Sequence, residues 1–451
     1  MAKAGQKSPT SACARKVDRR VLFKSAQQGR RCRRPQTFGN IVETFSETQH
    51  LKALTPYFHT TLHPRRMSPL VFVIFLIVYL LLCACIFVRS TQALPKKRWL
   101  RIAWVAGLAF CATAFFAGSA FRETVIAGLP VGHWLRVLGV TWMLTFPYWV
   151  VAVVFWEVIR LVNKRRRILS KCVETHRARA KVLALAATVA AVTVVFIFGY
   201  WRFSNPVITP LAVKINKPLG GQYAGSGKVL RIAVASDLHL GDIIDRERVR
   251  DFVSRINALQ PNIILLAGDV IDRSVDALEK QNMGVELEKL HAPLGVFAVL
   301  GNHEKYANAK RSLDFLEKHG VRVLYDEAVP LANGAFTLAG RADHSIKSRK
   351  TLEEILAGTD RARPIILMDH QPRELARAQA AGVDLQFSGH THAGQIWPVT
   401  WIIRFMYEVP HGYSRKGDFQ VYVTSGLGLW GFPARIGSKS EIVDVTVEFA
   451  K

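Results

Sequence analysis

The chain has 451 residues, enough for two or three domains, and a formal net charge of +27 at pH 7. Residues 1–200 hold 30 of the 61 Lys and Arg but 6 of the 34 Asp and Glu, so residues 201–451 are close to neutral. This distribution excludes the basic footprint of a nucleic-acid-binding protein from the second half, and we expect no nucleic-acid partner.

Residues 1–66 are polar and basic, with 14 Lys and Arg and no periodicity that would build a core. They predict either a basic, disordered tail or a sequence upstream of a true translation start at Met67. The second interpretation is favoured, because a tail with this charge would be difficult to translocate in the topology described below.

Four windows without charged residues follow, at 68–88, 102–121, 137–156 and 182–201. Each has about the 20 residues that span a bilayer. Buried helices of a soluble protein are the alternative. Four successive windows with basic ends and flanking Trp and Tyr favour a membrane domain over residues 67–202, with the lipid bilayer as a partner.

The loops between these windows differ in basic charge. The first carries five Lys and Arg, the second two and the third nine. Because Lys and Arg gather in cytoplasmic loops, we expect the first and third loops in the cytoplasm. Everything after Trp201 then lies on the periplasmic side of an inner membrane.

Residues 203–228 are rich in Pro and Gly and predict a linker. From Val229 to Lys451 strands and helices alternate, which predicts an α/β domain with a mixed sheet or two sheets. The expected strands are 229–235, 262–267, 295–300, 321–325, 335–340, 364–368, 384–388, 419–424 and 441–448. The expected helices are 246–259, 277–290, 307–319, 351–357 and 373–381.

Five polar clusters come directly after expected strands, and such strand-end loops converge at one edge of a sheet. Their candidate ligands are two carboxylates, one amide and four imidazoles: Asp237, His239, Asp269, Asn302, His370, His390 and His392. Mixed oxygen and nitrogen ligands without sulfur suit Mn, Fe, Zn or Ni. Seven ligands exceed the four of one tetrahedral zinc, so the set predicts two ions that share a carboxylate.

These clusters resemble, in order, the five-block signature of the calcineurin-like metallophosphoesterases, over about residues 229–446. The quoted blocks are Asp237-Leu238-His239, Gly268-Asp269 with Asp272-Arg273, Gly301-Asn302-His303-Glu304, His370, and Gly389-His390-Thr391-His392. Residues 389–395 and 425–428, with Pro433 and Arg435, are similar to the bacterial membrane-linked branch of YkuE-like and YaeI-like proteins. The resemblance implies a four-layer α/β/β/α sandwich, preceded here by an all-α transmembrane region.

The resemblance also implies roles for the individual side chains. One divalent ion would be held by Asp237, His239 and His392, and the other by Asn302, His370 and His390, with Asp269 as the bridge. His303 would face the substrate and protonate the leaving oxygen or stabilise phosphoryl charge. Asp272 would orient His303; alternatively, it forms an ordinary surface pair with Arg273.

These features predict a membrane-anchored phosphoesterase that uses two Mn, Fe or Zn ions. It would cleave a phosphomonoester, phosphodiester or pyrophosphate bond of an envelope or lipid-linked substrate by metal-hydroxide attack. One alternative is a metal- or cell-wall-binding module with vestigial activity. Another is a transporter or sensor that carries the hydrolase as an accessory, although charged side chains are missing from the four windows.

The aromatic residues late in the chain have two readings. Trp397, Trp401, Phe405 and Met406, with Trp430 and Phe432, are expected in the core. Near a membrane-tethered site, they could instead form an apolar patch that binds lipid.

Overall fold

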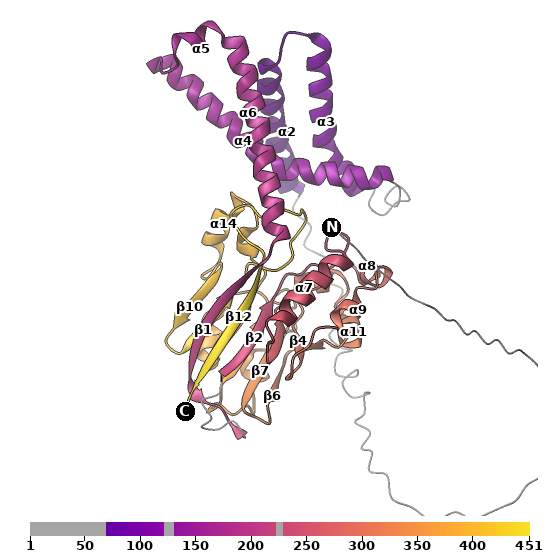
Figure 1. Cartoon of the computed structure of the whole chain (residues 1–451), viewed down its shortest axis with the longest axis vertical. Helices are drawn as coiled ribbons and strands as arrows, with labels where there is room; N and C mark the ends of the chain where they lie inside the picture. The colour runs from indigo at the N-terminus through magenta and orange to yellow at the C-terminus, as the bar shows by residue number, and fades with distance from the viewer. Residues whose placement is uncertain (1–68, 121–129, 222–228) are drawn as a thin grey trace, which may run out of the picture. The chain divides into compact units, whose positions relative to one another are not determined.

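The computed structural model describes residues 69–120, 130–221 and 229–451 (Figure 1). The expected tail at 1–66 and Met67 lie outside these residues. Four of the described helices are long and apolar enough to cross a membrane, with mean hydropathy between 1.8 and 3.3. They are α2 (Pro69–Ala93), α3 (Arg98–Ala120), α4 (Pro130–Arg166) and α6 (Arg177–Ser204), with the short α5 (Lys171–Thr175) between the last two.

Buried hydrogen bonds join three of these helices. The indole nitrogen of Trp142 in α4 donates to the hydroxyl of Tyr79 in α2 at 2.8 Å. That hydroxyl donates in turn to the carbonyl of Ala112 in α3 at 2.9 Å. A polar group inside a bilayer must find its partner within the protein, and this chain of contacts provides one for each group.

The second part of the chain contains two six-stranded sheets among the described residues. In the first, the strand order is β1 (Val207–Pro218), β12 (Glu441–Ala450), β2 (Val229–Ala235), β3 (Ile263–Leu266), β4 (Val296–Ala298) and β5 (Arg322–Val323). In the second, it is β10 (Gly412–Lys416), β11 (Phe419–Val423), β9 (Leu385–Ser388), β8 (Ile365–Asp369), β7 (Phe336–Arg341) and β6 (Glu327–Leu331).

The main core lies between the two sheets. Ile232 and Val445 of the first sheet and Leu338 and Ile366 of the second belong to one buried cluster. Residues of β7 and β8 that point to the opposite face pack under α12 (Leu352–Ile355) and α13 (Leu375–Ala380). Successive side chains of a strand point to opposite faces, so each sheet can serve two layers.

The helices α7 (Arg246–Ala258), α8 (Val275–Lys280), α9 (Gly284–Leu287), α10 (Asn302–Tyr306) and α11 (Ala309–Lys318) connect strands of the first sheet (Figure 1). The faces that α7 and α11 bury are apolar. This arrangement confirms the predicted α/β/β/α sandwich after an α-helical region.

Several elements differ from the sequence prediction. Within 203–228, the expected linker, Val207–Pro218 forms β1 and pairs in parallel with β12. The strands β6 and β10 and the helix α14 (Val399–Met406) are not predicted either. The expected helix 277–290 divides into α8 and α9, because Asn282 takes a left-handed φ of 51° between them.

Candidate metal centre

The predicted ligands lie where the carboxyl ends of the strands in both sheets meet. Asp237 follows β2, Asp269 follows β3 and Asn302 opens α10 after β4, and these three strands are parallel neighbours. In the second sheet, His370 follows β8 and His390 follows β9, which is also parallel to its neighbour. Parallel strands that end at one edge bring loops from distant parts of the chain together.

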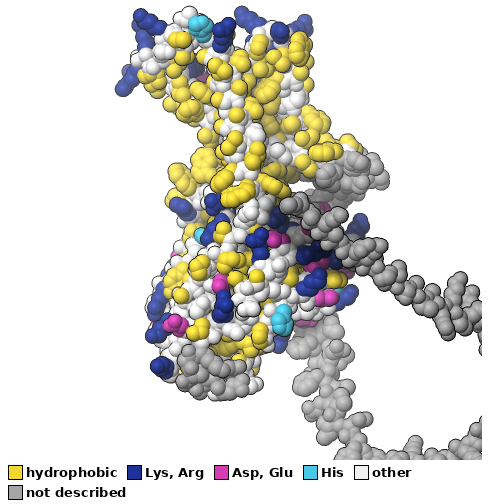
Figure 2. Space-filling model, viewed as in Figure 1, with side chains coloured by type: hydrophobic (Ala, Val, Ile, Leu, Met, Phe, Trp, Pro, Cys, Tyr) yellow, Lys and Arg dark blue, Asp and Glu magenta, His cyan; other side chains and the backbone are white. Residues whose placement is uncertain are grey.

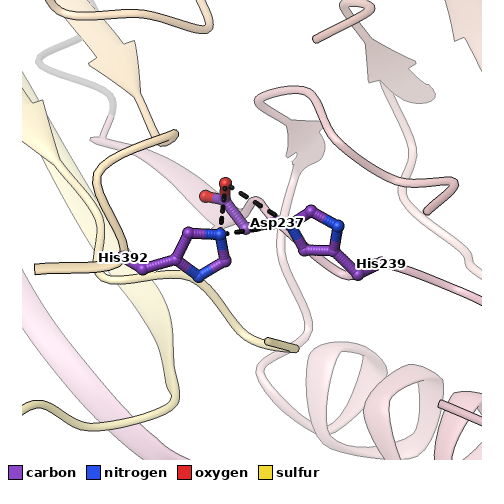
Figure 3. Close-up of side chains that lie close together, drawn as sticks. All are labelled: Asp237, His239 and His392. Carbon is purple, nitrogen blue, oxygen red and sulfur yellow. Dashed lines mark hydrogen bonds and ion pairs between the residues drawn. The ribbon is translucent and has the colours of Figure 1, made fainter. Parts of the chain in front are cut away.

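Asp237, His239 and His392 form the first group of ligand atoms (Figure 3). His392 Nε2 lies 3.3 Å from Asp237 Oδ1 and 3.1 Å from His239 Nε2. Two nitrogens bound at 2.0–2.1 Å to a tetrahedral ion lie about 3.4 Å apart. The spacing of these atoms therefore fits a shared cation.

Asp269, His370 and His390 form a second group. His370 Nε2 lies 3.1 Å from Asp269 Oδ2, and His239 Nε2 of the first group lies 3.9 Å from the same oxygen. One carboxylate oxygen thus faces both groups, which is the arrangement that a bridging ligand requires.

Asn302 lies next to the second group, because the backbone N–H of the following residue, His303, donates to Asp269 Oδ1 at 2.8 Å. The Asn302 side chain is buried, and within the described chain its Oδ1 has no hydrogen-bond partner. Buried amide oxygens almost always have a partner, so this oxygen is suited to a ligand that the polypeptide does not supply.

His303 and Asp272 form a pair at the side of the first group. His303 Nδ1 lies 3.0 Å from Asp272 Oδ1 and 2.9 Å from the backbone oxygen of Asp272. Arg273 Nε lies 3.2 Å from the other carboxylate oxygen. Asp272 therefore contacts both His303 and Arg273.

The backbone is strained at five of the seven predicted ligands. A left-handed φ near 50° to 70° is unusual for residues other than glycine and costs about 1–3 kcal/mol each. The predicted ligands with such φ angles are Asp237 (51°), His239 (50°), Asp269 (50°), His390 (68°) and His392 (51°). Strain that recurs at the residues of one constellation favours a functional site over ordinary turns.

Two glycines allow the loops to approach the carboxylates. A Cβ on Gly389 would lie 2.2 Å from Ser236 Oγ and 2.3 Å from Asp237 Oδ2. A Cβ on Gly301 would lie 2.1 Å from Asp269 Oδ1. A larger residue at either position would therefore displace a predicted ligand.

His390 and His392 have pKa values that suit metal binding, whereas in His370 burial is outweighed by the charge of Asp269, which raises the pKa of His370 well above its usual value. Burial, together with the nearby His370, lowers the pKa of His390 to about 4, and burial also lowers the pKa of His392. Both rings are neutral at pH 7 and keep a lone pair, which a ligand must have. In His370, Nδ1 lies 2.8 Å from the backbone oxygen of Ala267, which leaves Nε2 for Asp269 and the centre.

The pKa of His303 shifts in the opposite direction, upward. Burial lowers its pKa, but the hydrogen bond with the Asp272 carboxylate and the charge of Asp269 outweigh burial and raise it to about 9. In Asp272 burial acts in the other direction and raises the pKa. The hydrogen bonds of the carboxylate with His239 and His303 outweigh burial and hold the pKa of Asp272 well below its usual range. The pair is thus a protonated imidazole beside a carboxylate at neutral pH.

Two further residues support the centre without a predicted role. The buried Glu304 accepts from the backbone N–H of Asp269 at 3.2 Å and of Ile271 and Gly301 at 2.7 Å. The buried guanidinium of Arg435 donates to four carbonyls, at His392, Ser425, Gly426 and Gly428. Both lie in quoted sequence blocks, but their function depends on contacts that a sequence does not display.

Comparisons with known proteins agree with this geometry. The model of the calcineurin-like phosphoesterase family matches residues 230–394. An uncharacterized metallophosphoesterase of Aquifex aeolicus is 36% identical over 231 residues, which cover 49% of this chain and 86% of that protein. A relative in Helicobacter pylori is 33% identical over 221 residues, and the match covers 48% of this chain but 59% of the relative's length.

A third relative, from Danio rerio, is named as a transmembrane protein with a metallophosphoesterase domain. It is 28% identical over 377 residues, which cover 80% of this chain and 83% of that protein. A match of this length exceeds residues 229–451 and therefore extends into the helical region.

Proposed function

The chain belongs to the calcineurin-like metallophosphoesterase family, and from this premise we propose that it is a membrane-anchored phosphoesterase with a dimetal centre. Its substrate is a phosphomonoester, phosphodiester or pyrophosphate of an envelope or lipid-linked compound. The observation that carries the proposal is the position of Asp269 Oδ2, which faces His370 Nε2 at 3.1 Å and His239 Nε2 at 3.9 Å.

Each ion has its own set of side chains in this proposal. Asp237, His239 and His392 would hold one, and Asn302, His370 and His390 the other, with Asp269 between them. Two divalent ions, Mn, Fe or Zn, would polarise the phosphoryl oxygens and lower the pKa of water at the site.

His303 acts on the leaving group. Asp272 fixes the ring through Nδ1 at 3.0 Å, so Nε2 is left for the substrate. The raised pKa of about 9 keeps a proton on His303 at neutral pH, which it can give to the leaving oxygen. Asp272 is a positioning residue, because it acts through His303.

The helices anchor the enzyme in its membrane. We place the membrane domain in residues 67–202 and the catalytic domain in 229–451, joined through 203–228, with β1 added to the first sheet. The Lys and Arg counts of the loops support a periplasmic catalytic domain of an inner-membrane protein. A reporter fused after residue 210 that reads out in the cytoplasm would contradict this orientation.

The activity is tested with the full-length protein in detergent. We expect hydrolysis of p-nitrophenyl phosphate or bis(p-nitrophenyl) phosphate with Mn²⁺, loss of this activity on chelation and recovery on addition of Mn²⁺. Bound metal without turnover of these or of lipid phosphates would instead favour a metal- or cell-wall-binding module.

A further inference from the structure

We propose that the catalytic domain has a docking surface for the lipid bilayer. The docking surface consists of Trp401, Ile402, Phe405 and Met406 of α14 and of Trp430. These side chains are exposed by 62%, 53%, 89%, 60% and 59%, respectively. The expectation that Trp401, Phe405, Met406 and Trp430 belong to the core is therefore wrong.

The helix α14 exposes its apolar face to the outside and turns a polar residue inward, which is the opposite of an ordinary surface helix. A surface helix of a soluble domain turns its apolar face to the core and its polar face to water, as α11 does with Leu313, Phe315 and Leu316. In α14 the buried residue is the polar Thr400, and the large apolar side chains face outward. Figure 2 shows hydrophobic side chains gathered over the long helices and over α14.

The surroundings of α14 identify the bilayer as the occupant. Trp397, two residues before α14, has its ring 6.1 Å from that of Tyr148 in α4. Phe432, two residues after Trp430, has its ring 5.9 Å from that of Phe196 in α6. The docking surface thus continues from segments that touch two of the helices expected to span the membrane.

A backbone contact supports the same continuity. The N–H of Arg435 donates to the carbonyl of Gly199 in α6 at 2.9 Å, five residues before that helix ends at Ser204. The charged residue of α14 is Arg404, which is also exposed. An exposed face of Trp, Phe, Met and Ile with one Arg is the composition of a helix that lies in a membrane interface.

The docking surface is directly connected to the metal centre. The predicted ligand His392 opens the short 3₁₀ helix η3 (His392–Gly394), which α14 follows after four residues. At the other end of α14, the ring of Tyr407 lies 6.1 Å from that of His390. If the proposed function holds, the docking surface places the metal centre close to phosphates at the level of the lipid headgroups. Only this last statement rests on the proposed function; the docking itself does not.

Photochemical labelling of the full-length protein tests the docking surface. The protein is reconstituted in nanodiscs of phosphatidylcholine and phosphatidylglycerol that contain a phosphatidylcholine with a diazirine near the glycerol. After irradiation, lipid adducts are located by mass spectrometry. We expect adducts on α2, on Val399–Met406 and on Trp430, and none on α9, where Val285 is an exposed apolar residue.

Adducts on α2 without adducts on α14 would overturn the proposal, as would chain-to-chain cross-links at α14 in place of lipid adducts. The double variant Trp401→Gln with Phe405→Gln should lose the adducts on α14 and keep its hydrolysis of a soluble p-nitrophenyl ester. Val285→Gln is the matched control and should change neither. Adducts on α14 without any hydrolysis would support docking and contradict the proposed function, so the two fail separately.

Discussion

The Nε2 atoms of His239 and His392 lie 3.1 Å apart, although 153 residues separate the two histidines in the chain. Burial, together with His239 itself, lowers the pKa of His392 well below its usual range. A neutral His392 keeps a lone pair on one of its two ring nitrogens, and a shared cation would stabilise the tautomer that places this lone pair on Nε2. Metal analysis of variants in this first group therefore tests whether these residues bind an ion.

Asp237→Asn should lose one ion in preference to the other. Asp237 Oδ1 lies 3.3 Å from His392 Nε2, whereas the second group depends on Asp269, His370 and His390. The neutral amide is a weaker ligand than a carboxylate, so the metal content of the purified protein should fall by about one ion per chain.

Asp384→Asn is a matched control for this experiment. Asp384 is also a buried aspartate, but it pairs with Lys217 at 2.8 Å outside the centre. This variant should keep its full metal content. Equal loss of both ions from Asp237→Asn would contradict the division into two groups.

Asp269→Asn should affect both ions. Its Oδ2 faces His370 and His239, and its Oδ1 accepts from the backbone N–H of His303. Substitution of outer-shell partners costs 10–100-fold, and loss of the bridge itself should reduce kcat by about 100-fold or more. Unchanged turnover of a p-nitrophenyl ester would remove the dimetal mechanism.

Asp272→Asn should move the alkaline limb of the pH–rate profile to lower pH. A general acid must be protonated, so the rate falls as the pH rises through the pKa of His303, which Asp272 and Asp269 raise to about 9. Without the carboxylate the protonated ring loses its partner, and its pKa falls.

Bound cations would lower the pKa of His303 in wild type and variant alike, so the difference between the two profiles is the informative quantity. His303→Ala should abolish the limb together with most of the activity. An alkaline limb at the same pH in Asp272→Asn and in wild type would show that Asp272 does not act through His303.

Glu441 should make the free energy of unfolding depend on pH. Burial raises its pKa, but the hydrogen bonds with His411 and the backbone N–H of Ser425 outweigh burial and hold the pKa well below the usual range. The folded state then binds a proton less tightly than the unfolded state. The stabilisation is present above the unfolded pKa of about 4.3 and is lost as the pH falls through the lower, folded value.

Thermal unfolding of the full-length protein in detergent checks this linkage. Glu441→Gln should have a lower apparent Tm than wild type at pH 7, and the difference should shrink as the pH is lowered below about 4. Glu448→Gln serves as the control, because Glu448 lies on the same strand with an exposed side chain. A difference in Tm that is constant with pH would contradict the assignment.

The central strands were predictable from the sequence because they are buried on both faces. Ile263–Leu266 and Ile365–Asp369 are buried throughout, and such strands appear as short, nearly continuous apolar runs. The strands that the sequence does not predict, β1, β6 and β10, lie at sheet edges and have partly exposed side chains. Their pairing depends on neighbours more than on their own pattern.

The sequence by itself determined the family, the apolar helices and the seven candidate ligands, because these depend on residue type, order and local spacing. The tertiary structure alone decided that Asp269 Oδ2 faces both ligand groups, that Glu304 and Arg435 hold the loops, and that α14 exposes its apolar face. Distances between residues far apart in the chain, and the burial of each side chain, exist only once the two sheets have packed.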